Sequence, residues 1–438
     1  MSAGTVLILA LLGIVPIAAL GFFLGRRKPM AALADGQEFH SSPDYYGWYA
    51  VVWMFAPALA ISFLILALQS MGVLEAVIGI ERPGVLVLGA WIALPALLAW
   101  PIVRTIRPEL RARIIVERVV YGILVLASLV SILTTIAITL SVLFEAIQFF
   151  THPDVDALEF FTSTRWAPGS GWSAGGATSG SGQFGALPLF TGTFIITLIA
   201  MLVAAPVGVL AAVYMSEFAP RRIRRIAKPL LEVLAGIPTV VYGFFAAITV
   251  TPALVWLADG FDAYVLMPLN QALGLTGDQM WLLEATHSNG LSPGLIMGVM
   301  IIPFMSSLSD DVISAVPHDL RKGAHALGAT DAEVVKRVVL PAATPGIVSA
   351  FLLSVSRAIG ETMIVTMAAS VQANQTFNPL DNMTTVTVQI VYLLTGDQKF
   401  DSAMTLAAFG LGLTLLVLTL ILNVVASIVI RKFHQQYE

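Results

Sequence analysis

Two oppositely charged residues lie in the middle of a strongly apolar segment. Residues 350–370 read AFLLSVSRAIGETMIVTMAAS, and Arg357 and Glu361 stand near the centre. A charge at the centre of a membrane helix costs roughly 2.5–3.5 kcal/mol on insertion scales, and such residues are usually functional. The spacing of four predicts that both side chains share one helical face, where Glu361 partly neutralises the arginine.

The chemistry available to this pair is anion recognition. Arg357 offers a planar fork of donors that matches anion oxygens and stays charged. Glu361 can accept a hydrogen bond from a protonated anion, although its charge repels the anion. The same pair also fits a structural ion pair that locks the segment to a neighbouring helix, or a gate across a pathway, and the sequence leaves these alternatives open.

The composition indicates a polytopic membrane protein. Hydrophobic residues make up 57% of the 438 and charged residues 11%, against about 25% charged in an ordinary soluble domain. The net charge of −4 gives no bulk attraction to nucleic acid. The six histidines show no metal-ligand spacing, and the sequence has no cysteine and no Walker loop. We therefore expect no metal, cofactor or catalytic site, and any ATP hydrolysis would belong to another chain.

Nine apolar segments are long enough to cross a bilayer as helices. They comprise about residues 4–24, 46–70, 84–103, 119–147, 189–216, 229–257, 291–309, 346–373 and 403–430. Of the 23 Lys and Arg residues, nineteen fall on one side of this arrangement, in alternate loops and after the last segment. The positive-inside rule therefore predicts an outside N-terminus and a cytoplasmic C-terminus, with the loops 148–188, 258–290 and 374–402 outside.

A charged inner segment at 104–118 separates the first three spans from the other six. We expect a three-span N-terminal extension over 1–112 and a six-span core over 113–438. The extension carries no charge in the middle of a span, so we expect it to serve packing or assembly instead of transport.

The inner loop 316–347 predicts two short helices around a glycine. Pro317 suits a first helical turn, and apolar residues then recur at helical spacing up to Gly328. Thr330 and Glu333 form a capping box for the second helix. Pro341 predicts the end of that helix at 339–340, because proline disfavours helical geometry in the residue before it.

The same loop resembles the "EAA" loop of binding-protein-dependent ABC importer permeases. The matching positions are Lys322, Gly323, Ala324, Gly328, Val338, Leu340 and Pro341. Lys322 stands where the family has glutamate and Gly323 where it has alanine. The resemblance implies that this loop docks on a cytoplasmic ATPase and couples to its movement. An ordinary interfacial helix pair would show the same capping and amphipathicity.

Further stretches resemble the phosphate-specific transport (Pst) permeases over roughly 113–438. They are LPLFTGTFIITLIAMLVAAPVGVLAAVYMSEFAP at 187–220, LLEVLAGIPTVVYGFF at 230–245, ALGAT at 326–330 and SRAIGETMIV at 356–365. Gly360-Glu361-Thr362 followed by Met363 is more similar to the C-type subunit. The resemblance implies an all-α type I ABC importer permease (MetI-like) core, with Arg357, Glu361 and Thr362 in the substrate pathway or its gate.

The implied function is that of a transmembrane permease subunit in an ATP-driven phosphate importer of the bacterial inner membrane. The implied partners are an A-type second permease subunit, a cytoplasmic ATPase dimer that holds ATP and Mg, and a periplasmic phosphate-binding protein, all within the surrounding membrane lipid. Importers of sulfate, molybdate or tungstate share this architecture. An ion-coupled secondary transporter, or a membrane sensor or scaffold, are the alternatives of other classes.

Overall fold

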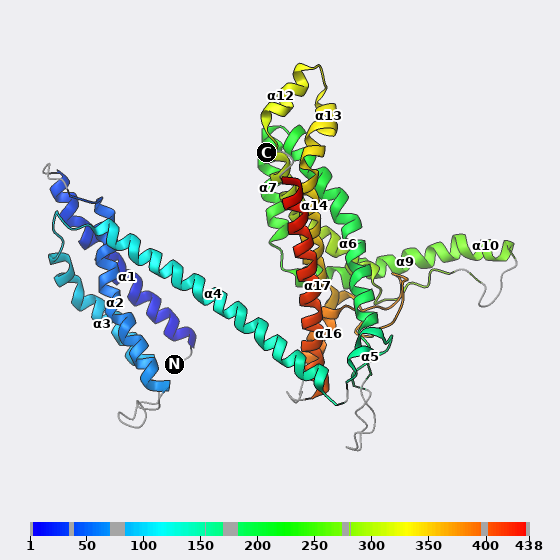
Figure 1. Cartoon of the computed structure of the whole chain (residues 1–438), viewed down its shortest axis with the longest axis horizontal. Coiled ribbons are helices and arrows are strands. Elements are labelled where there is room, and N and C mark those ends of the chain that lie inside the picture. Colours follow the sequence, from blue (N-terminus) through cyan, green and yellow to red (C-terminus); the bar gives the residue numbers. More distant parts are fainter. Residues whose placement is uncertain are drawn as a thin grey trace. The chain divides into compact units, whose positions relative to one another are not determined.

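The computed structural model describes residues 3–34, 39–70, 84–153, 155–169, 183–273, 280, 282–395 and 402–434 (Figure 1). The chain divides into two compact units, residues 1–136 and 137–438. The division lies inside the long helix α4 (Ala112–Thr151), whose first residue is at the boundary predicted for the N-terminal extension. Parts of the three loops predicted to lie outside fall beyond the described residues.

The first unit is built from three helices that all contact one another, α1 (Ala3–Ala34), α2 (Pro43–Ser70) and α3 (Gly84–Arg104), and from the start of α4. Glycines allow α1 and α2 to approach closely. A Cβ on Gly25 would lie 2.7 Å from the carbonyl oxygen of Tyr46. The Tyr46 hydroxyl donates to the Leu110 carbonyl at 2.7 Å, which ties α2 to the segment before α4.

The second unit is a helical bundle. Its long helices are α6 (Leu187–Val213), α11 (Leu291–Ala315), α14 (Leu340–Ile359) and α17 (Ala403–His434). Its shorter helices are α5 (Ala157–Thr162), α7 (Arg221–Ala235), α8 (Thr239–Phe245), α9 (Thr251–Phe261), α10 (Met267–Ala272), α12 (His318–Ala326), α13 (Asp331–Val334), α15 (Met363–Ala368) and α16 (Val386–Leu394). Four π-helical turns join them: η2 (Tyr214–Phe218), η3 (Ala246–Val250), η4 (Asp262–Leu266) and η6 (Val335–Val339). A two-residue antiparallel pair, β1 (Trp166–Ala167) with β2 (Gln183–Phe184), completes the unit.

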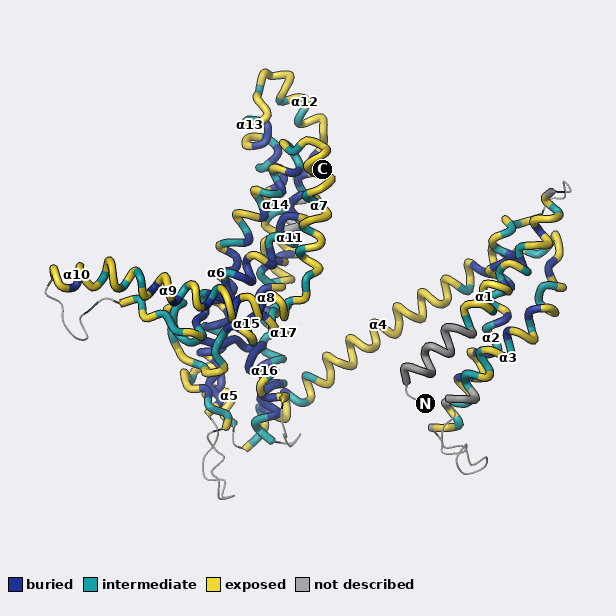
Figure 2. The backbone as a smooth tube through the Cα atoms, turned by 180° about the vertical axis from the view of Figure 1, so that it is seen from behind, coloured by how far each residue is buried: buried dark blue, intermediate teal, exposed yellow. Residues whose placement is uncertain are grey.

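The core of this unit lies where α6 packs against α11, and the buried residues gather there (Figure 2). Small residues let the two helices approach. A Cβ on Gly298 would lie 2.9 Å from the Ala200 carbonyl oxygen, and one on Gly208 would lie 2.9 Å from Met305 Cβ. Close helix approach through small residues is the usual packing of membrane helices. The pair α6 and α11 therefore forms the support on which the other elements are placed.

The all-α prediction is confirmed, and eight helices of the described residues are long and apolar enough to cross a membrane. They follow the predicted second to ninth spans in order, and α1 coincides with the first. The span predicted at 229–257 is wrong in its limits, since the helix runs from Thr239 to Ala272. Residues 221–235 form the separate helix α7, which carries five basic side chains and ends at Gly236 before Pro238.

The span predicted at 346–373 also needs correction, because it is not one helix. A continuous helix runs from Asp331 to Ile359, Gly360 caps it, and the short helix α15 starts only at Met363. Glu361 and Thr362 therefore lie in a break between two helices. A break in a membrane segment exposes backbone polar groups, which is tolerated where the segment is buried in protein or lines a cavity.

Candidate functional site

A cavity of about 350 Å³ lies between α7, α11 and the end of α14. Its polar and aromatic lining residues are Lys228, Glu232, Phe304, Ser307, Asp310 and Arg357. Two cations and two carboxylates thus share one hollow in an otherwise apolar part of the bundle. Because ionisable groups inside a membrane bundle mark substrate or ion pathways more often than elsewhere, this cavity is the candidate site.

Arg357 was expected from the sequence to be a site residue, and it also lines the cavity. It stands in the last turn of α14, and its guanidinium carbon lies over the Phe304 ring, 5.3 Å from the centroid. Both residues are described, and no ion pair joins Arg357 to Glu361. A guanidinium stacked on an aromatic face keeps its in-plane N–H donors free for an anion. Arg357 therefore contacts an aromatic ring, and its charge has no carboxylate partner within the part of the chain that the structure describes.

The predicted shared helical face of Arg357 and Glu361 is wrong, and Gly360 is the physical reason. The helix ends at Ile359, so the four-residue spacing no longer sets the direction of the Glu361 side chain. That carboxylate instead accepts from the Met363 N–H at 3.2 Å, at the start of α15. Glu361 and Thr362 are not among the cavity-lining residues.

The break at 360–362 is fixed by contacts to other helices. Thr387 of α16 donates its hydroxyl to the Glu361 carbonyl at 2.9 Å. Gly243 of α8 faces the other side, where an added Cβ would lie 3.0 Å from the Met363 carbonyl oxygen. The Thr362 carbonyl accepts the Thr366 hydroxyl at 2.7 Å. These bonds satisfy backbone groups that the interrupted helix leaves open.

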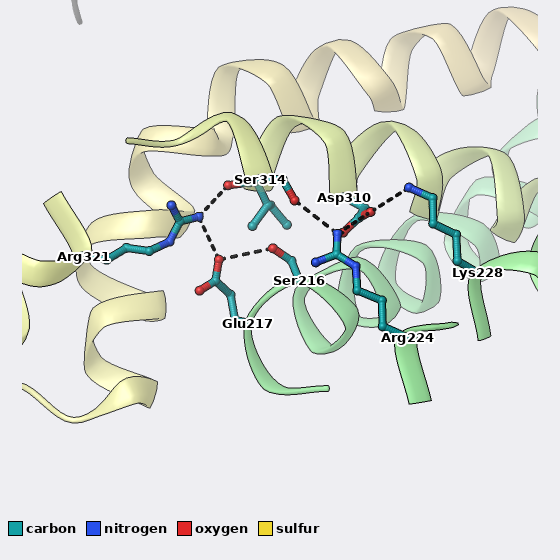
Figure 3. A network of polar contacts seen from close by, with 8 residues as sticks. Ser216, Glu217, Arg224, Lys228, Asp310, Ser314 and Arg321 are labelled. Atoms are coloured by element: carbon teal, nitrogen blue, oxygen red, sulfur yellow. Dashed lines mark hydrogen bonds and ion pairs between the residues drawn. The ribbon is translucent and has the colours of Figure 1, made fainter. Parts of the chain in front are cut away.

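A buried carboxylate completes the wall of the cavity beside α7, and the sequence analysis missed it. Asp310 of α11 is 2% exposed and accepts from two residues of α7 (Figure 3). Arg224 Nη2 donates to its two oxygens at 3.1 and 3.2 Å, and Lys228 Nζ donates at 3.3 Å. A carboxylate this buried would cost several kcal/mol without partners, roughly 3–5 kcal/mol when a pair is broken. The signal in the sequence was an aspartate inside the apolar run 291–315.

A second, partly buried ion pair ties the inner loop to the bundle. Arg321 Nη2 of α12 donates to Glu217 Oε1 in η2 at 2.9 Å, and Ser216 Oγ donates to the same oxygen at 3.2 Å (Figure 3). The same guanidinium donates to the carbonyls of Ile313, at 2.7 Å, and Val316. These carbonyls belong to the last turn of α11, where a helix leaves acceptors without partners. Arg321 therefore connects α12 both to η2, which follows α6, and to the end of α11.

The inner loop has the predicted helix–glycine–helix form. Gly328 follows α12 with φ +85°, a left-handed conformation that favours glycine. The Thr330–Glu333 capping box is confirmed, because the Glu333 N–H donates to Thr330 Oγ1 and the Thr330 N–H donates back to Glu333 Oε2 at 3.0 Å. Leu327, beside the glycine, is 91% exposed.

Three residues of the predicted loop motif lie on α12 itself. Lys322 is exposed and pairs with Asp319 at 3.6 Å, Gly323 faces open space, and Ala324 packs against a small apolar cluster at the ends of α6, α11 and α14. Of these three, Lys322 and Gly323 are available on the surface.

The predicted end of the second loop helix is wrong. Val338 lies in η6, and Leu340 and Pro341 open α14, so the helix that starts at Asp331 continues into the bundle. Pro341 is tolerated because it lies just after the π turn, separated from it by Leu340, at one of the first two positions of α14. The Leu340 N–H bonds to Val335 O. The loop is thereby joined to Arg357 by one continuous helix.

Among the described residues no group of three or more His, Cys, Asp or Glu side chains could hold a metal ion. The site consists of guanidinium, ammonium and carboxylate groups around a hollow. Guanidinium and ammonium groups donate charge-assisted hydrogen bonds to anion oxygens, and that is the chemistry these cations offer.

Two family models match the chain. Residues 204–436 match the model described as "Binding-protein-dependent transport system inner membrane component". Residues 7–88 match the model described as "Phosphate ATP-binding cassette transporter". The first match spans the cavity, the Asp310 cluster and the inner loop, and the second lies within the N-terminal unit.

Curated relatives resemble most of the chain. It is 31% identical to "Probable ABC transporter permease protein YqgH" of Bacillus subtilis over 311 residues, 71% of this chain and 87% of the relative. It is 35% identical to "Phosphate transport system permease protein PstC 1" of Mycobacterium tuberculosis over 294 residues, 64% of this chain and 83% of the relative. It is 31% identical to "Phosphate transport system permease protein PstC" of Mesorhizobium japonicum over 276 residues, 62% of this chain and 78% of the relative.

Proposed function

The chain belongs to the family of binding-protein-dependent transport system inner membrane components, and from that membership we propose that it is the C-type permease subunit of an ATP-driven phosphate importer. The chain covers more than four fifths of two relatives named as permeases, one of them a phosphate transport permease. The part from 113 to 438 is then a type I (MetI-like) importer core, and 1–112 is an extension that serves packing or assembly.

The observation that carries the proposal is the free charge of Arg357 beside a cavity. Its guanidinium lies on Phe304 and has no carboxylate partner among the described residues, and Lys228 adds a second cation to the same hollow. Phosphate at neutral pH carries one or two charges and offers several acceptor oxygens, which a guanidinium fork binds in pairs. We place Arg357 in the anion pathway, with Glu361 and Thr362 at the helix break that positions it.

The inner loop is the proposed coupling element. Lys322, Gly323, Ala324, Gly328, Val338, Leu340 and Pro341 belong to a segment that is attached to the bundle at Arg321 and continues through α14 to Arg357. A displacement of the loop would therefore be transmitted to the cavity through the helix Asp331–Ile359. The proposal requires an ATPase dimer with its ATP and Mg below the loop, an A-type permease subunit beside the core, and a phosphate-binding protein outside. No cofactor is proposed in this chain.

The proposed location is the bacterial inner membrane, with the N-terminus periplasmic and the C-terminus cytoplasmic. In that orientation the basic helix α7 and the coupling loop lie on the cytoplasmic side, where positively charged segments are favoured. The basic residues of α7 and the Asp310 cluster then stand at the exit side of the pathway.

The deciding experiment is uptake in proteoliposomes that contain the chain with its co-purified ATPase and permease partner. We expect phosphate to accumulate only with ATP and the binding protein, and sulfate, molybdate and tungstate to be excluded. Uptake driven by an ion gradient without ATP would indicate a secondary transporter instead. Accumulation of sulfate or molybdate in place of phosphate would assign a different oxyanion, and copurification without any uptake would indicate a sensor or scaffold.

A further inference from the structure

A line of cations leads from Arg357 to the surface of α7. The cavity beside Arg357 shares Lys228 and Glu232 with a second hollow, a groove of about 430 Å³ along α7. The other charged lining residues of that groove are Arg221, Arg224 and Arg225. Lys228 therefore lines both hollows.

The Asp310 carboxylate lies between Arg224 and Lys228, in the position where an anion would bind. Its carboxylate bonds to Arg224 and to Lys228, which are 39% and 41% exposed, while Asp310 itself is 2% exposed. The bonds of Arg224 to Asp310 and Ser314 all use Nη2, so Nε and Nη1 have no protein partner among the described residues. Arg224 and Lys228 are thus partly exposed to solvent, and the Asp310 carboxylate that binds them is buried.

We propose that Arg224 and Lys228 form the cytoplasmic exit site for the transported anion, and that Asp310 is its resident counter-ion. The ligand class is a tetrahedral oxyanion such as phosphate, whose oxygens accept from the same N–H donors that Asp310 now occupies. The carboxylate competes with the anion for these donors and takes them back on release. The proposal rests on the permease function proposed above.

A counter-ion of this kind lowers the affinity of the site for the anion. Low affinity suits an exit site, because an exit site must release its ligand. Removal of the carboxylate charge frees Arg224 and Lys228, which stay close together on α7 because they are four residues apart along one helical face. Charged donors without a partner bind an anion more strongly than donors that must first leave a carboxylate. A purely structural role of Asp310, as a tie between α7 and α11, predicts no gain in anion affinity.

The test is binding of radioactive inorganic phosphate to the purified full chain in nanodiscs of neutral phosphatidylcholine. Asp310→Asn should bind phosphate about tenfold more tightly than the unmodified chain, the effect of one charge-assisted hydrogen bond. Addition of Arg224→Gln or Lys228→Gln to that variant should remove the gain. The matched control is Asp311→Asn, the exposed neighbour on the same helix, which should leave the affinity unchanged.

A second variant does not depend on the buried site. Arg225→Gln changes an exposed groove residue and should slow phosphate uptake by the reconstituted importer severalfold, since it removes the next cation on the exit path. Arg222→Gln is its control, because Arg222 lies on the same exposed turn and does not line the groove. We expect normal uptake with that control.

Equal phosphate affinity of Asp310→Asn and Asp311→Asn would overturn the counter-ion role, and equal uptake by Arg225→Gln and Arg222→Gln would overturn the exit path along α7. A gain in Asp310→Asn that disappears in nanodiscs of anionic lipid would show that headgroup phosphates hold the site, which also overturns the assignment. The unmodified importer is assayed in parallel. Failure of its ATP-dependent phosphate uptake refutes the permease function, whereas normal uptake with unchanged binding in Asp310→Asn refutes only this inference.

Discussion

Arg321 of α12 and Glu217 of the π turn after α6 form an ion pair at 2.9 Å across 104 residues of sequence, with both side chains mostly buried. The pair joins α12 of the proposed coupling loop to the end of the α6–α11 core at which α6 and α11 lead into η2 and α12. Arg321 also donates to two carbonyls at the end of α11, so one side chain connects the loop to both core helices. The pair is therefore the place where coupling between the loop and the bundle can be measured.

We predict that Arg321→Gln lowers ATP-dependent phosphate uptake at least about fivefold, the low end of typical coupling energies. The variant loses the bond to Glu217 and the bonds to the α11 carbonyls. Glu217→Gln should lower uptake less, because those carbonyl bonds persist. In the double variant the two effects should not add, since both changes break one network. Simple additivity in uptake and in ATPase activity would show that the pair plays no joint role.

Gly328 is predicted to act through its backbone conformation and not through lack of space. A Cβ there would meet nothing within 4 Å, but φ is +85°. A non-glycine residue in such a conformation costs about 1–3 kcal/mol, and asparagine tolerates it best. Gly328→Asn should therefore retain most ATPase association, and Gly328→Val should lose most of it while the protein still inserts. Equal association of the two variants, measured by co-purification, would contradict this explanation.

Much of the fold followed from local features of the sequence. Apolar runs of sufficient length predicted the spans, and Thr330 with Glu333 predicted a cap that the structure contains, because such features depend only on neighbours along the chain. The errors have local causes as well. Gly360 interrupts a run that hydropathy alone treats as continuous, and the π turn before Pro341 lets a helix continue where proline normally ends it.

The polar clusters could not be predicted from spacing. Asp310 and Arg224 are 86 residues apart, and their contact requires α7 to pack against α11. The sequence does offer one hint, since an aspartate inside an apolar helix needs a partner. This hint identifies Asp310 as a residue that needs a cationic partner, but it does not show that the partners are Arg224 and Lys228. Arg357 was found for the same reason, while its contact with Phe304 depends on the tertiary structure.

The membrane orientation can be tested by single cysteines, because the chain has none of its own. Thr164→Cys, His287→Cys and Asn374→Cys place exposed thiols in the three loops predicted to be periplasmic. We expect an impermeant maleimide to label all three in intact spheroplasts. Arg222→Cys on α7 should react only after lysis. Labelling in the opposite order at any of the four positions would reverse or break the proposed topology.

The stacked arginine yields the last prediction. Arg357→Lys should reduce phosphate uptake roughly tenfold or more, although the charge is kept. An ammonium lacks the fork of donors of a guanidinium and its planar contact with Phe304. The magnitude follows from the loss of one charge-assisted hydrogen bond, which is worth about 1.5–3 kcal/mol. Arg357→Gln should abolish uptake while basal ATPase activity and assembly remain. Since no ion pair joins Arg357 to Glu361, the effects of Arg357→Lys and Glu361→Gln on thermal stability should add within about 0.3–0.5 kcal/mol. Strong non-additivity would restore the ion pair that the helix break at Gly360 argues against, and normal uptake by Arg357→Gln would remove this arginine from the transport pathway.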